Sequence, residues 1–227
     1  MSFCVCFARN YSISLPNLIH SALHSNPHQT AAFRPQSGQL KTAVTECITN
    51  SPNGDCSKGA HGSIGDWDVS AITDMGELFI TAHFFDQDLS KWDMSAVTNM
   101  YGMFYHALAF NKDVSKWDVS AVTNTEVMFS DAHAFNQDMS KWDVSAVTDM
   151  RGMFSYAHAF NQDLSKWDVS AVTSMVNMFF GAKSFKRELC GNAWVESEAD
   201  KSYMFTDSPG SISSTACEGY DYGGGYA

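Results

Sequence analysis

The sequence predicts an α/β repeat fold: a short right-handed solenoid with parallel strands, one short helix per coil and disulfide-bonded caps. Three observations lead to this prediction. Five successive tryptophans stand 25 residues apart, phenylalanine and alanine positions keep the same spacing, and within each copy the hydrophobic pattern changes from strand-like to helix-like. The tryptophans of the array are Trp67, Trp92, Trp117, Trp142 and Trp167.

Length and composition agree with one folded domain and exclude several classes of function. The chain has 227 residues, of which 44% are hydrophobic, so it can bury a sizeable core. Its formal net charge of -11 argues against binding nucleic acid or an anionic membrane through a basic surface. The longest early apolar run, residues 3–8, is far shorter than the roughly 18 residues that a membrane span needs. We predict no nucleic-acid partner and no membrane span.

The first part of each copy follows the pattern L-x-x-W-x-V, as in Leu164, Trp167 and Val169. This pattern mimics the L-x-x-L-x-L strand core of leucine-rich repeats. Because side chains alternate along a strand, Trp167 and Val169 are expected to point inward while Lys166 and Asp168 point outward. One such strand cannot bury its apolar face alone, so equivalent strands are expected to pair in parallel about 4.8 Å apart.

The second part of each copy has the spacing of a helix. In the copy from residue 142, Met150, Met153, Phe154 and Ala157 fall at i, i+3, i+4 and i+7. That spacing is typical of one buried face of a helix. We therefore expect one short helix after each strand.

The repeats also resemble a known family. The segments WDVSAITDMGELF (67–79) and FNQDLSKWDVSAVTSMVNMF (160–179) are similar to BspA-type leucine-rich repeat surface proteins of bacteria, mycoplasmas and some marine algae. The resemblance covers residues 64–190 and implies a secreted or surface-displayed interaction scaffold without enzymatic activity, sometimes adhesive. Two features depart from the family pattern: the period is 25 rather than about 26, and Thr125 stands where other copies have Met.

The predicted array needs a capping segment at each end, because its ends expose core and unpaired backbone. Residues 39–48 (QLKTAVTECI) are expected to form a capping helix with Leu40, Val44 and Ile48 on its apolar face. The predicted parts are a targeting-like or flexible segment (1–37), an N-terminal cap (38–63), five 25-residue repeats (64–190), a C-terminal cap (191–218) and a Gly/Tyr tail (219–227).

Four cysteines mark the ends of the array. Cys47 and Cys56 precede the first copy, while Cys190 and Cys217 flank the irregular segment after the last copy. Bonded cysteines need Cα atoms within about 7 Å, so a bond between opposite ends of a rod is excluded unless the chain folds back. We predict the disulfides Cys47–Cys56 and Cys190–Cys217, with free buried thiols as the alternative.

The cellular location is predicted from these cysteines and from the first residues of the chain. Disulfides favour an oxidising, extracellular or cell-surface location. The N-terminus lacks the apolar stretch of a standard secretory signal, and residues 1–45 contain no Asp or Glu, a composition closer to an organelle transit sequence. We predict an extracellular or surface location, with an organelle as the alternative.

The expected strands present one repetitive face. Lys, Asp and Ser recur at alternate positions on the outward side, so they form three columns. We predict that this face binds a protein or a glycan; the alternative is a charge lattice in which each Lys neutralises its own or a neighbouring Asp. The residues of the face are Lys91, Asp93, Ser95, Lys116, Asp118, Ser120, Lys141, Asp143, Ser145, Lys166, Asp168 and Ser170.

The sequence predicts no metal and no cofactor. Asn111, Asn136 and Asn161 each precede an acidic residue in the turns after the expected helices. The loop spacings of known calcium sites are absent, so we interpret the asparagines as a hydrogen-bonding ladder, with calcium as the alternative. His133 and His158 share a column but lack a third ligand at a suitable spacing.

No catalytic activity is predicted, because the sequence carries no nucleophile elbow, P-loop, dinucleotide fingerprint or H-E-x-x-H helix. An active site also needs a cluster of unlike residues, whereas this array repeats nearly the same surface at every coil. We predict a surface or secreted interaction scaffold; the alternative is a structural or assembly subunit of an organelle or larger complex. Copies differ at positions such as Tyr101, Glu126 and Arg151, where a specific protein partner is expected to bind.

Overall fold

The computed structural model describes residues 32–36 and 38–217, which belong to one unit of the chain, Ala32–Ala227. The predicted tail 219–227 and most of the predicted segment 1–37 lie outside the described residues. The named elements, in chain order, are α1 (Gln39–Asn50), η1 (Ile64–Asp66), β1 (Glu188–Leu189), α2 (Asn192–Val195) and β2 (Ser211–Ile212). The two short strands pair in parallel, with Glu188 opposite Ser211 and Leu189 opposite Ile212.

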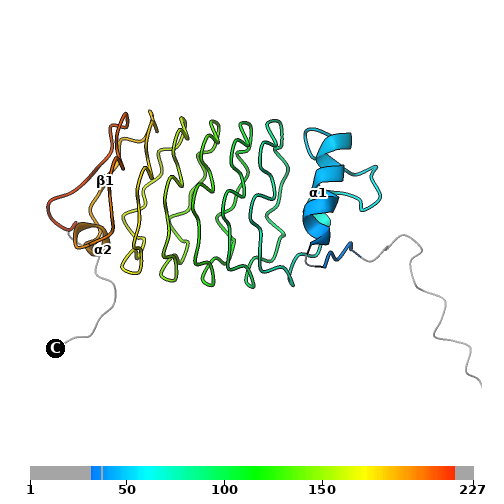
Figure 1. Cartoon of the computed structure of the whole chain (residues 1–227), viewed down its shortest axis with the longest axis horizontal. Coiled ribbons are helices and arrows are strands. Elements are labelled where there is room, and N and C mark those ends of the chain that lie inside the picture. The colour runs from blue at the N-terminus through cyan, green and yellow to red at the C-terminus, as the bar shows by residue number, and fades with distance from the viewer. Residues whose placement is uncertain (1–31, 37, 218–227) are drawn as a thin grey trace, which may run out of the picture. The chain divides into compact units, whose positions relative to one another are not determined.

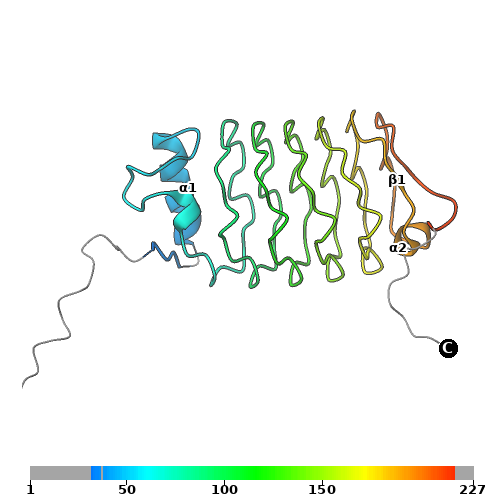
Figure 2. The same ribbon diagram turned by 180° about the vertical axis from the view of Figure 1, so that it is seen from behind.

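Between η1 and β1 the chain forms a row of coils that lie side by side (Figure 1). Each coil contributes one residue to a ladder of parallel backbone bridges. The bridged residues are Asp74, Asn99, Asn124, Asp149, Ser174 and Asp200. The last bridge adds a sixth segment to the row, within the range 191–218 that was predicted as the C-terminal cap. Figure 2 shows the same row from behind.

The core lies inside the coils and consists of columns of aromatic and aliphatic side chains. Phe104 stacks on Phe79 and on Phe129, with ring centroids 5.2 and 5.5 Å apart. The tryptophans are buried, as predicted, and from the second coil onward each indole N–H donates to a carbonyl of the preceding coil. Trp142 Nε1, for example, lies 3.0 Å from Val114 O. Because a buried N–H without a partner is destabilising, these bonds hold each coil in register with the one before it.

The helix predicted in each coil is absent: between residues 67 and 187 the structure contains no helix. Residues 151–156 form consecutive turns instead. Gly152 and Tyr156 have φ values of 57° and 54°, in the left-handed region, so the backbone cannot continue as a right-handed helix. Met150, Met153 and Phe154 are buried nevertheless, because the turns return side chains to the core at a spacing that also fits a helix.

The strands predicted around the tryptophans are replaced by turns as well. Trp142 N–H donates to Met139 O of its own coil at 3.0 Å, whereas Gly152 N–H donates to Val176 O of the next coil at 2.9 Å. Most direct backbone pairing between coils thus lies at the consecutive turns, with further bonds just before and after them, such as Thr123 N–H to Thr98 O at 2.9 Å. We call those turns the turn row: 74–82, 99–107, 124–132, 149–157, 174–182 and 200–207. We call the segments around the tryptophans the tryptophan side: 64–70, 89–95, 114–120, 139–145 and 164–170.

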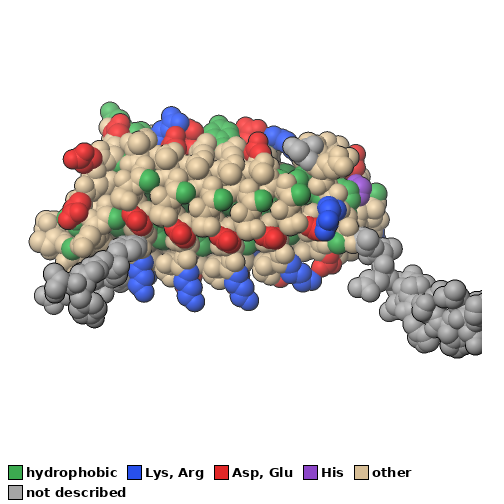
Figure 3. Space-filling model, turned by 90° about the horizontal axis from the view of Figure 1, so that it is seen from below, with side chains coloured by type: hydrophobic (Ala, Val, Ile, Leu, Met, Phe, Trp, Pro, Cys, Tyr) green, Lys and Arg blue, Asp and Glu red, His purple; other side chains and the backbone are tan. Residues whose placement is uncertain are grey.

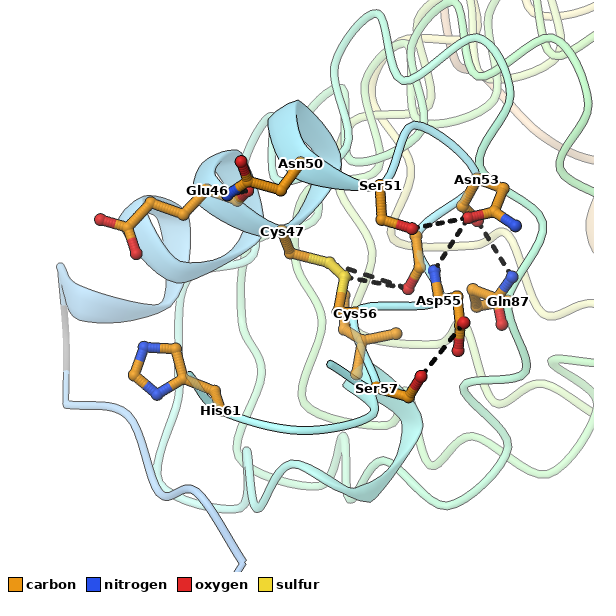
Figure 4. The surroundings of a disulfide bond; sticks show 12 residues. Glu46, Cys47, Asn50, Ser51, Asn53, Asp55, Cys56, Ser57, His61 and Gln87 are labelled. Carbon is orange, nitrogen blue, oxygen red and sulfur yellow. Dashed lines mark hydrogen bonds between the residues drawn. A yellow bond between two sulfur atoms is a disulfide. The ribbon is translucent and has the colours of Figure 1, made fainter. Parts of the chain in front are cut away.

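Helix α1 covers the first coil and confirms the predicted capping helix, although it ends at Asn50 rather than at residue 48. Its buried residues include Leu40 and Val44, while Ile48 is only partly buried. The loop after α1 is tied to the array by Gln87 Nε2, which donates to Asn53 O at 3.0 Å (Figure 4).

The structure places each predicted cysteine pair at disulfide distance. The Cα atoms of Cys47 and Cys56 are 5.3 Å apart, and those of Cys190 and Cys217 are 5.1 Å apart. The first pair joins α1 to the loop that follows it (Figure 4), and the second joins the chain after β1 to the chain after β2. Both agree with the predicted pairing of one disulfide per cap.

Candidate binding face

The tryptophan side alternates buried and exposed residues, and this places the predicted ligand-binding residues on one surface. Trp142 and Val144 are buried, while Lys141, Asp143 and Ser145 are exposed. The same alternation occurs in the other coils, so all the predicted residues of the face are exposed except Asp168, which is half-buried. Figure 3 shows a row of acidic side chains beside a row of basic side chains along one face of the molecule.

Each aspartate of the face is held by the serine two residues later. Asp143 Oδ1 accepts hydrogen bonds from the backbone N–H and the hydroxyl of Ser145, at 3.1 and 2.6 Å. The same bonds from Ser95 hold the pKa of Asp93 below its ordinary value, although burial and the neighbouring aspartates oppose this shift. Bonds from Ser120 lower the pKa of Asp118 in the same way, so Asp93 and Asp118 carry negative charge at neutral pH.

Two lysines of the face have acidic neighbours other than the aspartates of the predicted charge lattice. Lys91 Nζ pairs with Asp66 Oδ1 of the preceding coil at 2.7 Å. Asp113 belongs to the same coil as Lys116: the Ser115 hydroxyl and N–H lower its pKa, and the positive charge of Lys116 lowers it further. Asp66 was missed in the sequence analysis, although its spacing of 25 residues from Lys91 was a usable signal. These lysines act on acids outside the face, not on the aspartate row.

The first position of the aspartate row shows how a cation binds there. Arg34 Nε donates to Asp68 Oδ2 at 2.7 Å, and the two side chains form an ion pair. Further along the row, the neighbouring charges that act on Asp93 are those of Asp68 and Asp118, which raise its pKa but are outweighed by the bonds from Ser95. The face thus offers two parallel rows of opposite charge to a polar ligand.

The predicted asparagine ladder is confirmed. Asn111 Oδ1 accepts the N–H of Asn136 at 3.0 Å, and Asn136 Oδ1 accepts the N–H of Asn161 at 2.9 Å. These oxygens therefore bond within the fold. His133 and His158 lie together, with ring centroids 4.5 Å apart. In the part of the chain that the structure describes, no group of three or more His, Cys, Asp or Glu residues is placed to hold a metal ion.

The turn row carries the side chains that differ between coils. Arg151 pairs with Asp149 of its own coil at 2.7 Å and with Glu126 of the preceding coil at 2.9 Å. Tyr101 and Tyr156 are 37% and 41% exposed. This surface is separate in sequence from the Lys, Asp and Ser face, and its chemistry changes from coil to coil.

One feature near the N-terminal cap has no counterpart in the sequence analysis. A cavity of about 500 Å³ lies beside α1 and is lined by Glu46, Asp55, His61 and the Cys47–Cys56 disulfide (Figure 4). These residues come from stretches without a repeat or a motif, so only folding around α1 brings them together. The His61 ring also stacks on Phe33, with centroids 3.8 Å apart.

The side-by-side coils and their polar rows define a repeat protein whose surface extends over several copies. The family described as "Mycoplasma protein of unknown function, DUF285" matches residues 54–150 and 128–215. Together the two matches cover more than half of the chain, so the chain belongs to this family. No curated protein matches the chain. Among the described residues, no helix has the length and apolar character needed to cross a membrane.

Proposed function

We propose that this chain is a non-enzymatic interaction module of the cell surface or extracellular space, built as a capped right-handed solenoid similar to BspA-type leucine-rich repeat proteins. The parallel bridges between side-by-side coils support the fold. The two cysteine pairs, one in each cap, support an oxidising location.

The observation that carries this proposal is the repeated exposure of Lys, Asp and Ser on the tryptophan side. Equivalent side chains of neighbouring coils lie about 4.8 Å apart if the coils keep the spacing of paired strands. A ligand with repeating polar groups, such as a glycan chain, contacts several coils at once, and weak contacts then add through multivalency. The Asp–Ser bonds fix the carboxylates before binding, which lowers the entropic cost of association.

Binding to immobilised neutral and acidic oligosaccharides tests the proposal. The double variant Lys116→Ala, Lys141→Ala removes two exposed cations at the centre of the face, and we expect it to weaken binding by about tenfold or more. The matched control is Lys58→Ala, Lys186→Ala, which removes two exposed lysines outside the face. No binding by the unchanged chain, or an equal loss in both double variants, contradicts a glycan-binding role for this face. Binding of a protein rather than a glycan at the same lysines would keep the face but change the class of ligand.

A further inference from the structure

At alternate positions of the turn row the backbone N–H groups donate toward the next coil, so the last segment differs from all the others. In each earlier coil, backbone N–H groups at alternate positions donate to carbonyls of the next coil. In the fifth coil these donors lie 2.8 to 3.0 Å from their acceptors. The donors are the N–H groups of Met175, Asn177, Phe179 and Gly181, and the acceptors are the carbonyls of Asp200, Ser202, Met204 and Thr206.

The sixth segment repeats the backbone of the fifth but has no following coil. Tyr203 and Asp207 have φ values of 58° and 57°, as Asn177 and Gly181 have 58° and 66° at the equivalent positions. The bonds inside the segment are also kept, since Met204 N–H donates to the carbonyl three residues earlier at 3.1 Å. The sixth segment therefore has the backbone conformation of the coils that bond to a following coil.

Four backbone N–H groups of this segment have no acceptor within the described residues. We call them the open edge: the N–H groups of Lys201, Tyr203, Phe205 and Asp207. In the five preceding coils the equivalent donors are bonded to a neighbouring coil. Unpaired edges of this kind are templates for another chain, because each free donor gains a partner when a backbone is added.

The column of stacked phenylalanines also ends at the open edge, so its last ring has a neighbour on one side only. Phe205 stacks on Phe179 with centroids 5.5 Å apart, and it is half-buried, whereas Phe179 is fully buried between its neighbours. Tyr203 is 69% exposed. An aromatic ring on the outer side of Phe205 would extend the phenylalanine column by one position and bury apolar surface.

We propose that the open edge binds an extended peptide segment of a partner protein, which adds to the row as a further coil. Its carbonyls at alternate residues accept the four N–H groups, and an aromatic side chain stacks on Phe205. The structure itself shows this chemistry between successive coils, where carbonyls spaced two residues apart meet the same donors and Phe154 stacks on Phe179.

A second copy of the chain fits this edge less well than a partner segment. The complementary carbonyls of the first coil belong to Asp74, Gly76, Leu78 and Ile80, none of which accepts a backbone hydrogen bond within the described residues. Helix α1 caps that end, however, with Leu40 and Val44 buried and with an ion pair from Lys41 to Glu77 at 3.0 Å. A second copy would have to release this helix before its first coil reached the open edge.

A synthetic peptide tests the proposal. The probe is fluorescein-labelled DMRGMFSYAHAF, the sequence of residues 149–160, and the control is a scrambled peptide of the same composition. We expect saturable binding to the full chain by fluorescence anisotropy, no binding of the scrambled peptide, and slowed amide hydrogen exchange at Tyr203 and Phe205 in the complex. The exchange measurement reports on the backbone donors directly, so it separates edge pairing from nonspecific contact.

Variants on both sides of the contact sharpen the test. Phe205→Ala in the chain, or replacement of the first Phe of the peptide by Ala, is expected to weaken binding by about tenfold or more, as loss of an aromatic anchor does. The matched control is Tyr156→Ala, an exposed aromatic of an interior coil, which should leave binding unchanged. If Phe205→Ala lowers stability, the peptide variant, which leaves the chain unchanged, carries the test of the aromatic contact.

Three results would overturn the proposal. The first is slow exchange of the Tyr203 and Phe205 amides in the free chain, because the edge would then already be covered. The second is peptide binding without protection of these amides. The third is self-association in sedimentation with protection of the same amides, because a second copy would then be the occupant.

Discussion

The two long sides of each coil are held together by different chemistry. On the turn row, neighbouring coils bond through backbone groups, as Gly152 N–H does with Val176 O at 2.9 Å. On the tryptophan side, side chains reach across: Trp142 Nε1 bonds to Val114 O at 3.0 Å. Backbone groups are present whatever the side chain, whereas an indole N–H is supplied by tryptophan alone.

This difference explains which positions repeat in the sequence. Exposed and half-buried positions of the turn row vary between coils, with Tyr101, Glu126, Arg151 and Val176 at equivalent places. The tryptophans repeat because their indoles bond between coils, and the phenylalanines of the turn row repeat because they stack between coils. A surface that varies without loss of the fold suits recognition of a particular partner, while the repeated surface suits an extended ligand. The predictions below compare the two sides, from the largest expected effect to the smallest.

Removal of one indole should have the largest effect. Trp142→Ala is expected to lower the free energy of unfolding by about 3 to 5 kcal/mol, because it opens a cavity and removes a bond between coils. Tyr101→Ala, on the turn row, should change it by less than about 1 kcal/mol. Urea denaturation measures both values. Equal losses would mean that the two sides do not differ as described.

Loss of one asparagine from the ladder should have a smaller effect. Asn136→Ala removes the acceptor of the Asn161 N–H and one of the two acceptors of Gln162 Nε2, and we expect a loss of about 1 to 2 kcal/mol. Arg151→Ala, which breaks two half-exposed ion pairs of the turn row, should lose less than about 1 kcal/mol. The same denaturation experiment ranks the two variants, and the reverse order would contradict the comparison.

One residue of the turn row has an unfavourable backbone conformation. Val127 has φ of 48°, and a β-branched residue is disfavoured there. Asn177 occupies the equivalent position two coils later with φ of 58°, which Asn tolerates. We expect Val127→Asn to raise the free energy of unfolding by roughly 0.5 to 1 kcal/mol, and Asn177→Val to lower it by a similar amount. If Val127→Asn instead lowers the free energy of unfolding and Asn177→Val raises it, side-chain packing outweighs the backbone at this position.

The smallest expected effects depend on pH and come from His158, directly after the turn row, and from the aspartates of the tryptophan side. Burial, together with His133 and Lys183, lowers the pKa of His158 from 6.5. The unfolded chain then takes up a proton before the folded chain does, so stability decreases as the pH falls through 6.5.

The aspartates of the tryptophan side respond in a lower pH range. Hydrogen bonds from Ser95 and Ser120 lower the pKa of Asp93 and Asp118 from 3.8, so their contribution is present above pH 3.8 and is lost as the pH falls through the lowered values. Urea denaturation from pH 8 to pH 3 follows both changes. His158→Gln should abolish the loss of stability near pH 6.5 and leave the loss at lower pH unchanged. If the loss near pH 6.5 persists in this variant, another group causes it.

The 25-residue period, the buried tryptophans, the capping helix and the asparagine ladder could be predicted from the sequence, because each depends on a side chain at a fixed spacing. The turns could not, since Met150, Met153 and Phe154 have a spacing that fits a helix equally well, and the left-handed backbone at Tyr156 has no signal in its residue type. The sixth segment was missed because Phe205 follows Phe179 by 26 residues, one more than the period.

For the charged residues, too, the sequence predicts which side chains are exposed but not which groups they contact. Lys, Asp and Ser were placed on one face correctly, because alternation alone determines exposure. Their partners were not predicted, since the reach of Lys91 to Asp66 depends on how neighbouring coils are offset. The cavity beside α1 depends on contacts between unrelated segments, which leave no pattern in the sequence.

Transplanting turn-row residues between coils tests the central claim most directly. The double variant Arg151→Tyr, Tyr156→His gives the fourth coil the residues that the second coil has at Tyr101 and His106. The φ values of Tyr156 and His106 are 54° and 57°. Urea denaturation of this variant should give a free energy of unfolding within about 1 kcal/mol of the unchanged chain, while Trp142→Ala loses several times more. A transplant that destabilises the chain as strongly as Trp142→Ala would show that side chains, not the backbone, hold the turn row together.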